Sequence, residues 1–320
     1  MPRIAERAAL SGRVLITWVD FDPDGETTGR RLRDAGLELH LAPKRGARSA
    51  TEVAELASDA VAAIVSTDPF DRDVFEVARR LRVIARVGVG TDSIDLEAAA
   101  AAGVIVATTP GANRDAAADH TVAMMLAAVR RVTEHDRSVR DGKWERGGLM
   151  TPWELNGTTV GIVGFGSIGR AVARRLSGFD IELLVSDPAV DGERTVPLPE
   201  LLRRSDIVSL HLPLTGATER IIDGRAIARM RDDAILVNTS RGALVDERAL
   251  AAALQSGGLR AAALDVFADE PTVPAALATL PNVVLTPHIG GLSDRSIRAM
   301  TEQATQHVLD VLADGREAVA

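Results

Sequence analysis

Residues 159–169 read TVGIVGFGSIG, a strand-like run followed by closely spaced glycines. Thr159–Val163 is apolar and rich in β-branched residues, which is typical of a buried strand. Gly164–Gly169 follows as a G-x-G-x-x-G pattern, and Arg170–Leu176 continues it as a helix. In that context the glycines permit a tight turn, a close approach of pyrophosphate to the backbone, and close packing of helix on strand. The free N–H groups at the helix start favour phosphate. We therefore expect a dinucleotide site with contacts from Gly164, Gly166, Ser167, Ile168 and Gly169.

Apolar runs recur on both sides of this stretch, with helical segments between them. Those that follow it are Glu182–Ser186, Ile207–Leu210, Ala234–Asn238, Ala261–Val266 and Val283–Thr286. Those that precede it are Val14–Val19, Leu37–Leu41, Val61–Val65, Val83–Val87 and Val104–Ala107. Strands that alternate with helices predict an α/β protein with parallel sheets, and the series from Thr159 onward fits a doubly wound dinucleotide-binding fold.

One acidic residue specifies the form of the dinucleotide. Asp187 ends the strand Glu182–Ser186, about twenty residues beyond the glycine pattern. A carboxylate there accepts hydrogen bonds from the ribose hydroxyls of NAD and repels the 2′-phosphate of NADP. The sequence therefore favours NAD.

Composition excludes several other classes of protein. The chain has 320 residues, a net charge of −8 and no cysteine or tyrosine. Without a basic excess we expect no nucleic-acid partner and no anionic membrane surface. No run approaches the length of a membrane span, no signal peptide is recognisable, and no histidine pattern has the spacing of metal ligands. We expect a cytoplasmic enzyme without a metal.

Three polar side chains follow predicted strands of the second half. Arg241 follows Ala234–Asn238, and Glu270 and His288 follow the next two strands. Ligands of open α/β sheets bind outside the carboxyl ends of the strands. Arginine matches a carboxylate, histidine exchanges protons near neutral pH, and a carboxylate behind the histidine fixes its tautomer. These residue types suit hydride transfer to a 2-keto acid.

The motifs around these residues resemble those of the D-isomer-specific 2-hydroxyacid dehydrogenases, in particular short phosphoglycerate dehydrogenase-like members. They read NTSRG from Asn238, DVFADEP from Asp265 and TPHIGG from Thr286. The resemblance implies that His288 is the acid/base, that Glu270 is its partner and that Arg241 binds the substrate carboxylate. It also implies two Rossmann-like domains. An NAD domain at 109–290 is inserted into a smaller, flavodoxin-like substrate domain formed by 1–108 and 291–320.

A glycine-rich loop in the first half is the expected substrate site. Arg86 begins the run RVGVGTD, and in the family the N–H groups at Val89 and Gly90 grip the substrate carboxylate. Phosphoglycerate dehydrogenases carry an arginine after the third strand, but here Ser66–Phe70 has none and Asp68 adds negative charge. With Arg86 as the one nearby cation, 3-phosphoglycerate is disfavoured, and glyoxylate, hydroxypyruvate or another small acid stays open.

The resemblance leaves further expectations. A long helix from about 113 to 140 is expected to form a homodimer, and His120 within it is expected to serve packing. A formate dehydrogenase-like enzyme is disfavoured by Glu270, where those enzymes have glutamine. An NAD-sensing corepressor or scaffold on the same fold stays open. Further cofactor contacts are expected from His211, Leu212, Thr218, Thr239, Ser240, Asp265, Gly290 and Gly291.

Overall fold

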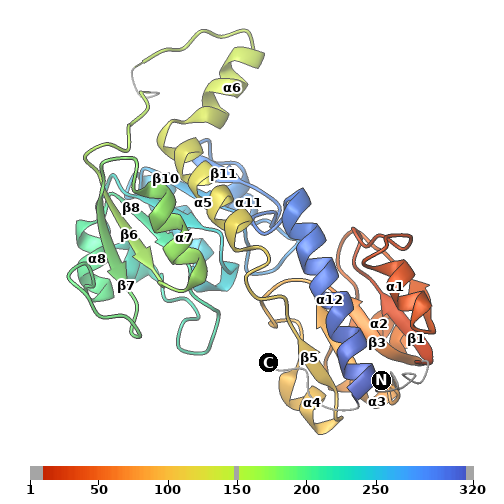
Figure 1. The fold of residues 1–320 in the computed structure, drawn as a ribbon. Coiled ribbons are helices and arrows are strands. Elements are labelled where there is room, and N and C mark those ends of the chain that lie inside the picture. The colour runs from red at the N-terminus through yellow and green to blue at the C-terminus, as the bar shows by residue number, and fades with distance from the viewer. Residues whose placement is uncertain (1–9, 148–150, 315–320) are drawn as a thin grey trace, which may run out of the picture. The chain divides into compact units, whose positions relative to one another are not determined.

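The computed structural model describes residues 10–147 and 151–314, and the chain divides into two compact units. Unit 1 comprises Met1–Asn113 with Ser293–Ala320, and unit 2 comprises Arg114–Leu292, so the first and the last described helices both belong to unit 1 (Figure 1). The sequence places these boundaries near 108 and 290. Residues 1–9 and 315–320, which the sequence assigns to the first domain, lie outside the described residues.

Unit 1 is built on a parallel sheet of five strands in the order β2-β1-β3-β4-β5. The strands are β1 (Gly12–Ile16), β2 (Leu37–Leu41), β3 (Ala60–Val65), β4 (Val83–Arg86) and β5 (Ile105–Ala107). This order is the flavodoxin-like one, as the sequence predicts, and its topological switch point lies between β1 and β3.

Helices cover both faces of this sheet. They are α1 (Gly29–Asp34), α2 (Ala50–Ala57), α3 (Arg72–Val77), α4 (Leu96–Ala101) and α12 (Asp294–Asp314). Val14 and Ile16 pack with residues of α1 and α12, whereas Leu15 between them packs with residues of α2, α3 and α4. This alternation follows from the two-residue period of a strand. The C-terminal helix α12 thus completes the core of the unit that the N-terminal residues begin.

Unit 2 has a parallel sheet of six strands in the order β11-β10-β9-β8-β6-β7. The strands are β6 (Thr159–Val163), β7 (Glu182–Ser186), β8 (Ile207–Leu210), β9 (Ile235–Asn238), β10 (Ala261–Leu264) and β11 (Val283–Leu285). A parallel bridge between Val185 and Thr195 extends the sheet beyond β7. The switch point falls between β6 and β8, and the glycine loop follows β6 directly.

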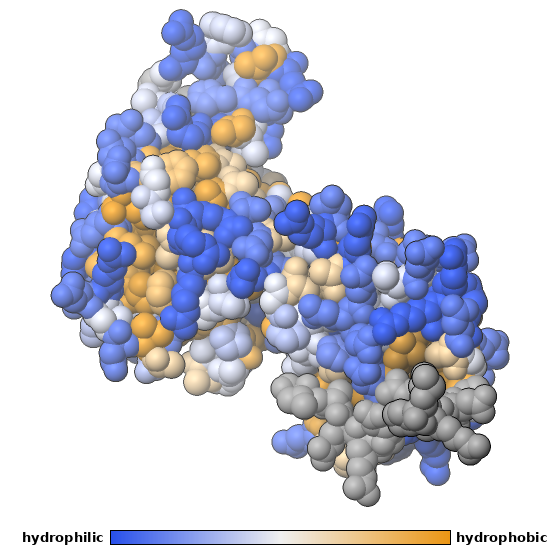
Figure 2. Space-filling view, viewed as in Figure 1, coloured by the Kyte–Doolittle hydropathy of each residue, from blue (hydrophilic) through white to orange (hydrophobic). Residues whose placement is uncertain are grey.

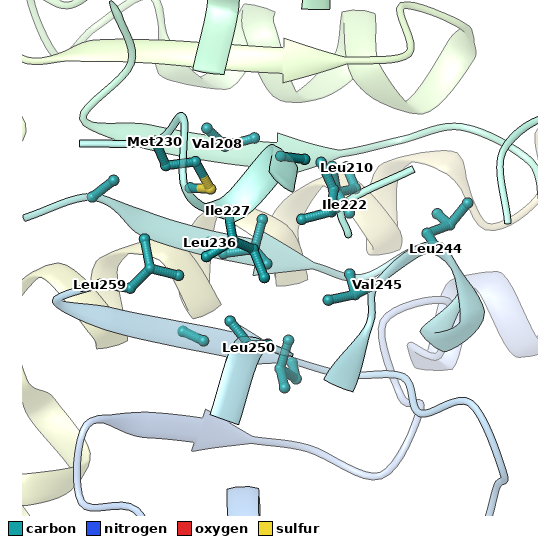
Figure 3. Close-up of a cluster of buried hydrophobic side chains, with 14 of the residues drawn as sticks. Val208, Leu210, Ile222, Ile227, Met230, Leu236, Leu244, Val245, Leu250 and Leu259 are labelled. Carbon is teal, nitrogen blue, oxygen red and sulfur yellow. The ribbon is translucent and has the colours of Figure 1, made fainter. Parts of the chain in front are cut away.

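The helices of unit 2 are again divided between two faces. They are α5 (Arg114–Val129), α6 (Val132–Arg140), α7 (Ser167–Leu176), α8 (Leu198–Arg204), α9 (Gly224–Ile227), α10 (Glu247–Ser256) and α11 (Ala275–Ala278). Helices α5 and α7 pack on one face of the sheet. The other face is covered by α8 to α11, and Figure 3 shows Leu210 and Leu236 of the sheet among the side chains of these helices.

The long helix expected at about 113–140 is two helices, which corrects the sequence prediction. Helix α5 ends at Val129 and α6 begins at Val132, with Arg131 in the left-handed region at φ 53°. The Trp153 N–H donates to the Val129 carbonyl at 3.0 Å, which satisfies a C-terminal carbonyl of α5. The Arg131 guanidinium pairs with Glu134 in the first turn of α6. One hydrogen bond from a distant residue and one local ion pair thus accompany a break that the apolar spacing does not show.

Helix α6 extends away from the rest of unit 2 (Figure 1). Among the described residues, no helix is long and apolar enough to cross a membrane.

Candidate active site

The glycine loop at the end of β6 has the geometry of a phosphate cradle. Gly164 has φ +88°, and a Cβ there would lie 2.5 Å from the His211 carbonyl oxygen. A Cβ on Gly169 would lie 2.3 Å from the Gly164 carbonyl oxygen, so this glycine lets α7 pack against the loop. A Cβ on Gly166 would meet nothing within 4 Å, which leaves open space for a pyrophosphate beside the backbone. The residues present therefore fit a dinucleotide.

The start of α7 adds electrostatic support to the cradle. Its N-cap is Gly166, which provides no side-chain hydrogen bond to the first turn. The N–H groups of Ser167 and Ile168 are among those that an α-helix leaves without an internal partner at its N-terminus. Together with the helix dipole they favour an anion at this point.

Asp187, directly after β7, hydrogen-bonds to the backbone of the glycine loop. Its Oδ2 accepts the Phe165 N–H at 2.6 Å and its Oδ1 accepts the Ala189 N–H at 2.8 Å. These backbone donors, chiefly that of Phe165, hold the pKa of Asp187 below its usual range. The side chain is thus an ionised carboxylate that retains further lone pairs for hydroxyl donors.

His211 and Leu212 follow β8 on the other side of the switch point. Burial lowers the pKa of His211 to about 4, so its imidazole is neutral in the physiological range. Its Nε2 lies 2.9 Å from the Ser209 hydroxyl, and its backbone N–H donates to Val163 at 2.7 Å. The Ser240 hydroxyl donates to the Leu212 carbonyl at 2.8 Å. These bonds connect the loops that follow β6, β8 and β9.

Two threonines of the expected cofactor set lie in different surroundings. The Thr218 hydroxyl donates to the Pro213 carbonyl at 2.7 Å and shapes the loop after β8. The Thr239 hydroxyl lies 2.7 Å from that of Thr121 on α5. Both threonines are engaged within the chain, and their cofactor contacts stay predictions.

The structure brings Glu270 and His288 together. The loop after β10 carries Glu270, the loop after β11 carries His288, and the Nδ1 of His288 lies 2.7 Å from Oε2 of Glu270. A carboxylate only accepts hydrogen bonds, so Nδ1 carries the proton that faces it. The His288 side chain is 35% exposed. Its Nε2 is the ring nitrogen left to exchange a proton with a ligand.

Glu270 is held as an anion. Its Oε1 accepts the Phe267 N–H at 3.0 Å. Burial raises the pKa of Glu270, but His288, the Phe267 N–H and the charge of Arg241 outweigh it, and the pKa falls below its ordinary value. The carboxylate therefore stays ionised in the neutral range, where it accepts the Nδ1 proton of His288.

Arg241 approaches this pair through close packing of two loops. It follows β9 and precedes the 3-10 helix Gly242–Leu244. A Cβ on Gly242 would lie 1.9 Å from the Phe267 carbonyl carbon, so only glycine lets the Arg241 loop lie against the Glu270 loop. The Asn238 amide donates to the Arg241 carbonyl at 2.8 Å, and the Arg241 guanidinium donates to the Ser240 carbonyl at 2.6 Å. These contacts fix a cation near the His–Glu pair.

Asp265 clamps the backbone on which His288 lies. Its carbonyl accepts the His288 N–H at 2.7 Å. Its Oδ1 accepts the Ile289 N–H at 2.9 Å, and its Oδ2 accepts the Gly290 N–H at 2.7 Å. Three successive N–H groups thus end on one fully buried residue. Both carboxylate oxygens are engaged within the chain, and the expected contact of Asp265 with the cofactor stays a prediction.

The three hydrogen bonds to Asp265 explain the strained backbone of His288. His288 has φ 54°, a conformation that costs a non-glycine residue about 1–3 kcal/mol and persists only where the surroundings impose it. Gly290 lies two residues further along the same turn. A Cβ there would lie 2.8 Å from Oδ2 of Asp265 and 3.3 Å from the His120 ring, so the turn requires a residue without a side chain. Gly291 follows it directly.

His120 is a site residue that the sequence analysis missed. Its Nε2 lies 3.1 Å from the Thr286 hydroxyl and 3.3 Å from Oδ1 of Asp265. The Thr286 hydroxyl gives its own proton to Asp265 at 2.6 Å, so His120 Nε2 must be the donor. His120, expected to serve packing, thus also hydrogen-bonds to the residues around the turn that carries His288. Its position on α5 gave no sequence signal of contact with residues far along the chain.

The predicted substrate loop lies in unit 1, after β4. The Arg86 guanidinium donates to the Val87 carbonyl at 2.9 Å, and the Gly88 N–H donates to the Thr109 hydroxyl at 2.8 Å. Gly88 has φ +133°, and Val89 at the loop tip is exposed. Within the part of the chain that the structure describes, the N–H groups of Val89 and Gly90 make no hydrogen bond, as an anion cradle requires.

The glycine loop and the His288–Glu270 pair lie at the carboxyl edge of the same sheet in unit 2. A dinucleotide cradle beside a histidine–carboxylate pair is the arrangement that a dinucleotide-dependent dehydrogenase needs.

Comparison with known proteins identifies the family. Residues 122–290 match the family model described as D-isomer specific 2-hydroxyacid dehydrogenase, NAD binding domain. A glyoxylate reductase of Korarchaeum cryptofilum is 44% identical over 254 residues, which are 76% of each chain. The crystal structure of the TT0316 protein from Thermus thermophilus superposes with a TM-score of 0.87 at 40% identity, covering 95% of this chain and 98% of that one. The chain belongs to the D-isomer specific 2-hydroxyacid dehydrogenase family.

A second relative is longer than this chain. The D-3-phosphoglycerate dehydrogenase of Mycobacterium tuberculosis is 38% identical over 305 residues, which are 93% of this chain and 53% of the relative. The chain thus spans about half the length of that enzyme. The predictions of an α/β fold with two Rossmann-like domains, of an NAD-dependent dehydrogenase and of this family are confirmed.

Proposed function

We propose that this protein reduces a small 2-keto acid to the 2-hydroxy acid with NADH, and that His288 is its acid/base. The observation that carries the proposal is the 2.7 Å contact between His288 and Glu270, with Nε2 of His288 left for the substrate. Arg241 binds the substrate carboxylate, because its planar guanidinium matches that group.

Each residue has one task in the reaction. When it is bound in the glycine cradle, NADH supplies the hydride that reduces the substrate carbonyl carbon. His288 donates the Nε2 proton to the carbonyl oxygen, so that a C–OH group results. Glu270 holds the Nδ1 proton and stabilises the imidazolium before the transfer. In the reverse direction the neutral imidazole accepts the hydroxyl proton.

Two features support the choice of substrate and cofactor. The relatives named glyoxylate reductase support a small acid such as glyoxylate or hydroxypyruvate. The ionised Asp187 beyond the glycine loop favours the free ribose hydroxyls of NAD over the 2′-phosphate of NADP.

The test is an assay of the purified protein with NADH and a panel of 2-keto acids, followed by the loss of NADH absorbance. We expect turnover of glyoxylate or hydroxypyruvate, and weaker use of NADPH. Asp187→Ala is expected to narrow the difference in kcat/KM between NADH and NADPH, because it removes the charge that repels the 2′-phosphate.

A protein that binds NADH but turns over none of the acids would contradict the proposal and favour a corepressor or scaffold. Reduction of NAD by formate, measured in a separate assay as a gain of NADH absorbance, would instead favour a formate dehydrogenase-like activity.

We also propose that α6 forms part of a homodimer interface. Val132 and Val139 lie two helical turns apart on one face of α6 and are 53% and 57% exposed. Trp144, shortly after the helix, is 79% exposed. Figure 2 shows hydrophobic side chains interrupting the hydrophilic surface at this end of unit 2. Single exposed apolar residues are ordinary, but three on one projecting segment indicate a contact surface.

Sedimentation velocity tests the interface. The native protein is expected to sediment as a dimer, and Val139→Asp is expected to shift it toward the monomer because the new charge would be buried. Val77→Asp is the control, since Val77 is also an exposed valine on a helix but lies in unit 1. A monomeric native protein would contradict the proposal.

A further inference from the structure

Helix α5 is anchored in the core of unit 2. Its residues Met125 and Val129 are buried and belong to one hydrophobic cluster with Val237 of β9 and Ala263 of β10. Side chains in such a core are closely packed and have little freedom to shift. Helix α5 is therefore a rigid support beside the strand ends from which the loops of the site emerge.

His120 connects this support with the turn that carries His288. Its Nε2 donates toward the Thr286 hydroxyl at 3.1 Å and lies 3.3 Å from Oδ1 of Asp265. Burial raises the pKa of Asp265, but hydrogen bonds, that of His120 among them, outweigh it and hold the pKa below its ordinary value. Asp265 is therefore an ionised, buried carboxylate, and His120 supplies its donor from the helix.

The next residue of the helix connects α5 with the loop that carries Arg241. Thr121 is fully buried, and its hydroxyl donates to the Ala117 carbonyl at 2.7 Å. Because that proton is engaged, the Thr239 hydroxyl is the donor across its 2.7 Å contact with Oγ1 of Thr121. Thr239 follows β9 directly and precedes Arg241 by two residues. Thr121 is thus a buried acceptor for the Arg241 loop.

The two contacts lead to different loops. Successive residues of an α-helix are rotated by about 100° around its axis, so the side chains of His120 and Thr121 point in different directions. His120 reaches the ends of β10 and β11, and Thr121 reaches the end of β9. Each of the two helix residues therefore holds a loop that the other does not touch.

We propose that His120 and Thr121 are positioning residues with separate tasks. His120, acting through Asp265, holds the turn of the acid/base, and Thr121 holds the loop of the carboxylate-binding Arg241. This inference rests on the proposed function and adds to it the two residues that orient its groups. A displaced acid/base slows the chemical step and lowers kcat. A displaced carboxylate anchor weakens binding in the ground state and the transition state alike, which raises KM.

Two variants of His120 test its task by the reach of their side chains. Glutamine places an N–H donor as many bonds from Cα as Nε2 of histidine, whereas the amide nitrogen of asparagine is one bond nearer. With glyoxylate or hydroxypyruvate and saturating NADH, we expect His120→Asn to lower kcat by about tenfold or more, as misplaced catalytic groups generally show, with little change in KM. We expect His120→Gln to keep kcat close to the native value. His120→Leu also lacks the donor and is expected to match His120→Asn, so the test stands where one of these two variants does not fold.

Two variants of Thr121 form the complementary pair. Valine has the shape of threonine without the hydroxyl, and serine retains the hydroxyl. We expect Thr121→Val to raise KM for the same acid by about fivefold, the effect of one hydrogen bond, with a smaller change in kcat. Thr121→Ser is expected to return KM close to the native value.

The possible failures are distinguishable. A native protein that turns over none of the acids would overturn the proposed function and this inference with it. Native turnover with the same changes of kcat and KM in His120→Asn and Thr121→Val would leave that function standing and overturn the separate tasks. A kcat of His120→Gln as low as that of His120→Asn would overturn the assignment of His120, because its donor would then have no part in positioning.

Discussion

His288→Gln is expected to lower kcat for 2-keto acid reduction by about a thousandfold, within the range that a positioned acid/base contributes. Glutamine approximates the size of the imidazole, but it has no proton to transfer near neutral pH. The dissociation constant of NADH, measured by fluorescence, is expected to change little. The glycine cradle that supports NADH binding is built by β6, α7 and the ends of β7 and β8 and does not include His288.

The matched control for this variant is His307→Gln. His307 lies on α12 in unit 1, and no part of the site is assigned to that helix. Its kcat is expected to equal that of the native enzyme. Retention of most of the native kcat by His288→Gln would show that another group transfers the proton.

Asp265→Asn is expected to impair both the turn that carries His288 and the stability of unit 2. Asparagine offers one acceptor oxygen, and its amide nitrogen would face an N–H of Ile289 or Gly290. A buried donor left without an acceptor costs about 1–3 kcal/mol, so the free energy of unfolding in urea should fall by about 2 kcal/mol. Because His288 is held at φ 54° by these bonds, kcat should fall at least about tenfold, as misplaced catalytic groups generally show.

Asp206→Asn separates the loss of stability from the loss of catalysis. Asp206 Oδ2 accepts the Thr159 N–H at 2.7 Å, so it is also a carboxylate bound to a backbone donor in unit 2. It precedes β8 and lies at the amino edge of the sheet. We expect Asp206→Asn to lose stability with little change in kcat. If Asp265→Asn lost no more activity than Asp206→Asn, the clamp would have no part in catalysis.

Most of the fold could be predicted from the local sequence. Thr159–Val163, Glu182–Ser186 and Ile207–Leu210 are strands with the predicted bounds, because short apolar runs buried on both faces have few alternative structures. The break at Arg131 was not predictable in this way. Arginine is a good helix former, and the carbonyl of Val129 at the end of α5 accepts the N–H of Trp153, which lies 24 residues further along the chain.

The contacts of the active site likewise fall into those that the sequence predicted and those that it did not. Glu270 and His288 were expected to meet because each follows a strand, and the strand ends lie at one edge of the sheet. The hydrogen bonds of His120 join side chains without a motif or a periodic spacing. The same holds in unit 1, where Arg48 pairs with Asp68 and adds a second cation to the one that the sequence indicated. Such contacts depend on the packing of complete elements, which composition and spacing do not specify.

The pH dependence of kcat/KM in both directions of the reaction tests whether His288 is the acid/base. The pKa of Glu270 lies below its ordinary value and that of His211 is about 4, so neither group titrates in the neutral range. Reduction requires the protonated form of His288, and oxidation of the 2-hydroxy acid requires the neutral form. We therefore predict that kcat/KM for reduction falls as pH rises, that kcat/KM for oxidation rises, and that His288→Gln loses both dependences. Profiles of the same shape in both directions, or pH dependences that survive in His288→Gln, would contradict the assignment of His288 as the acid/base.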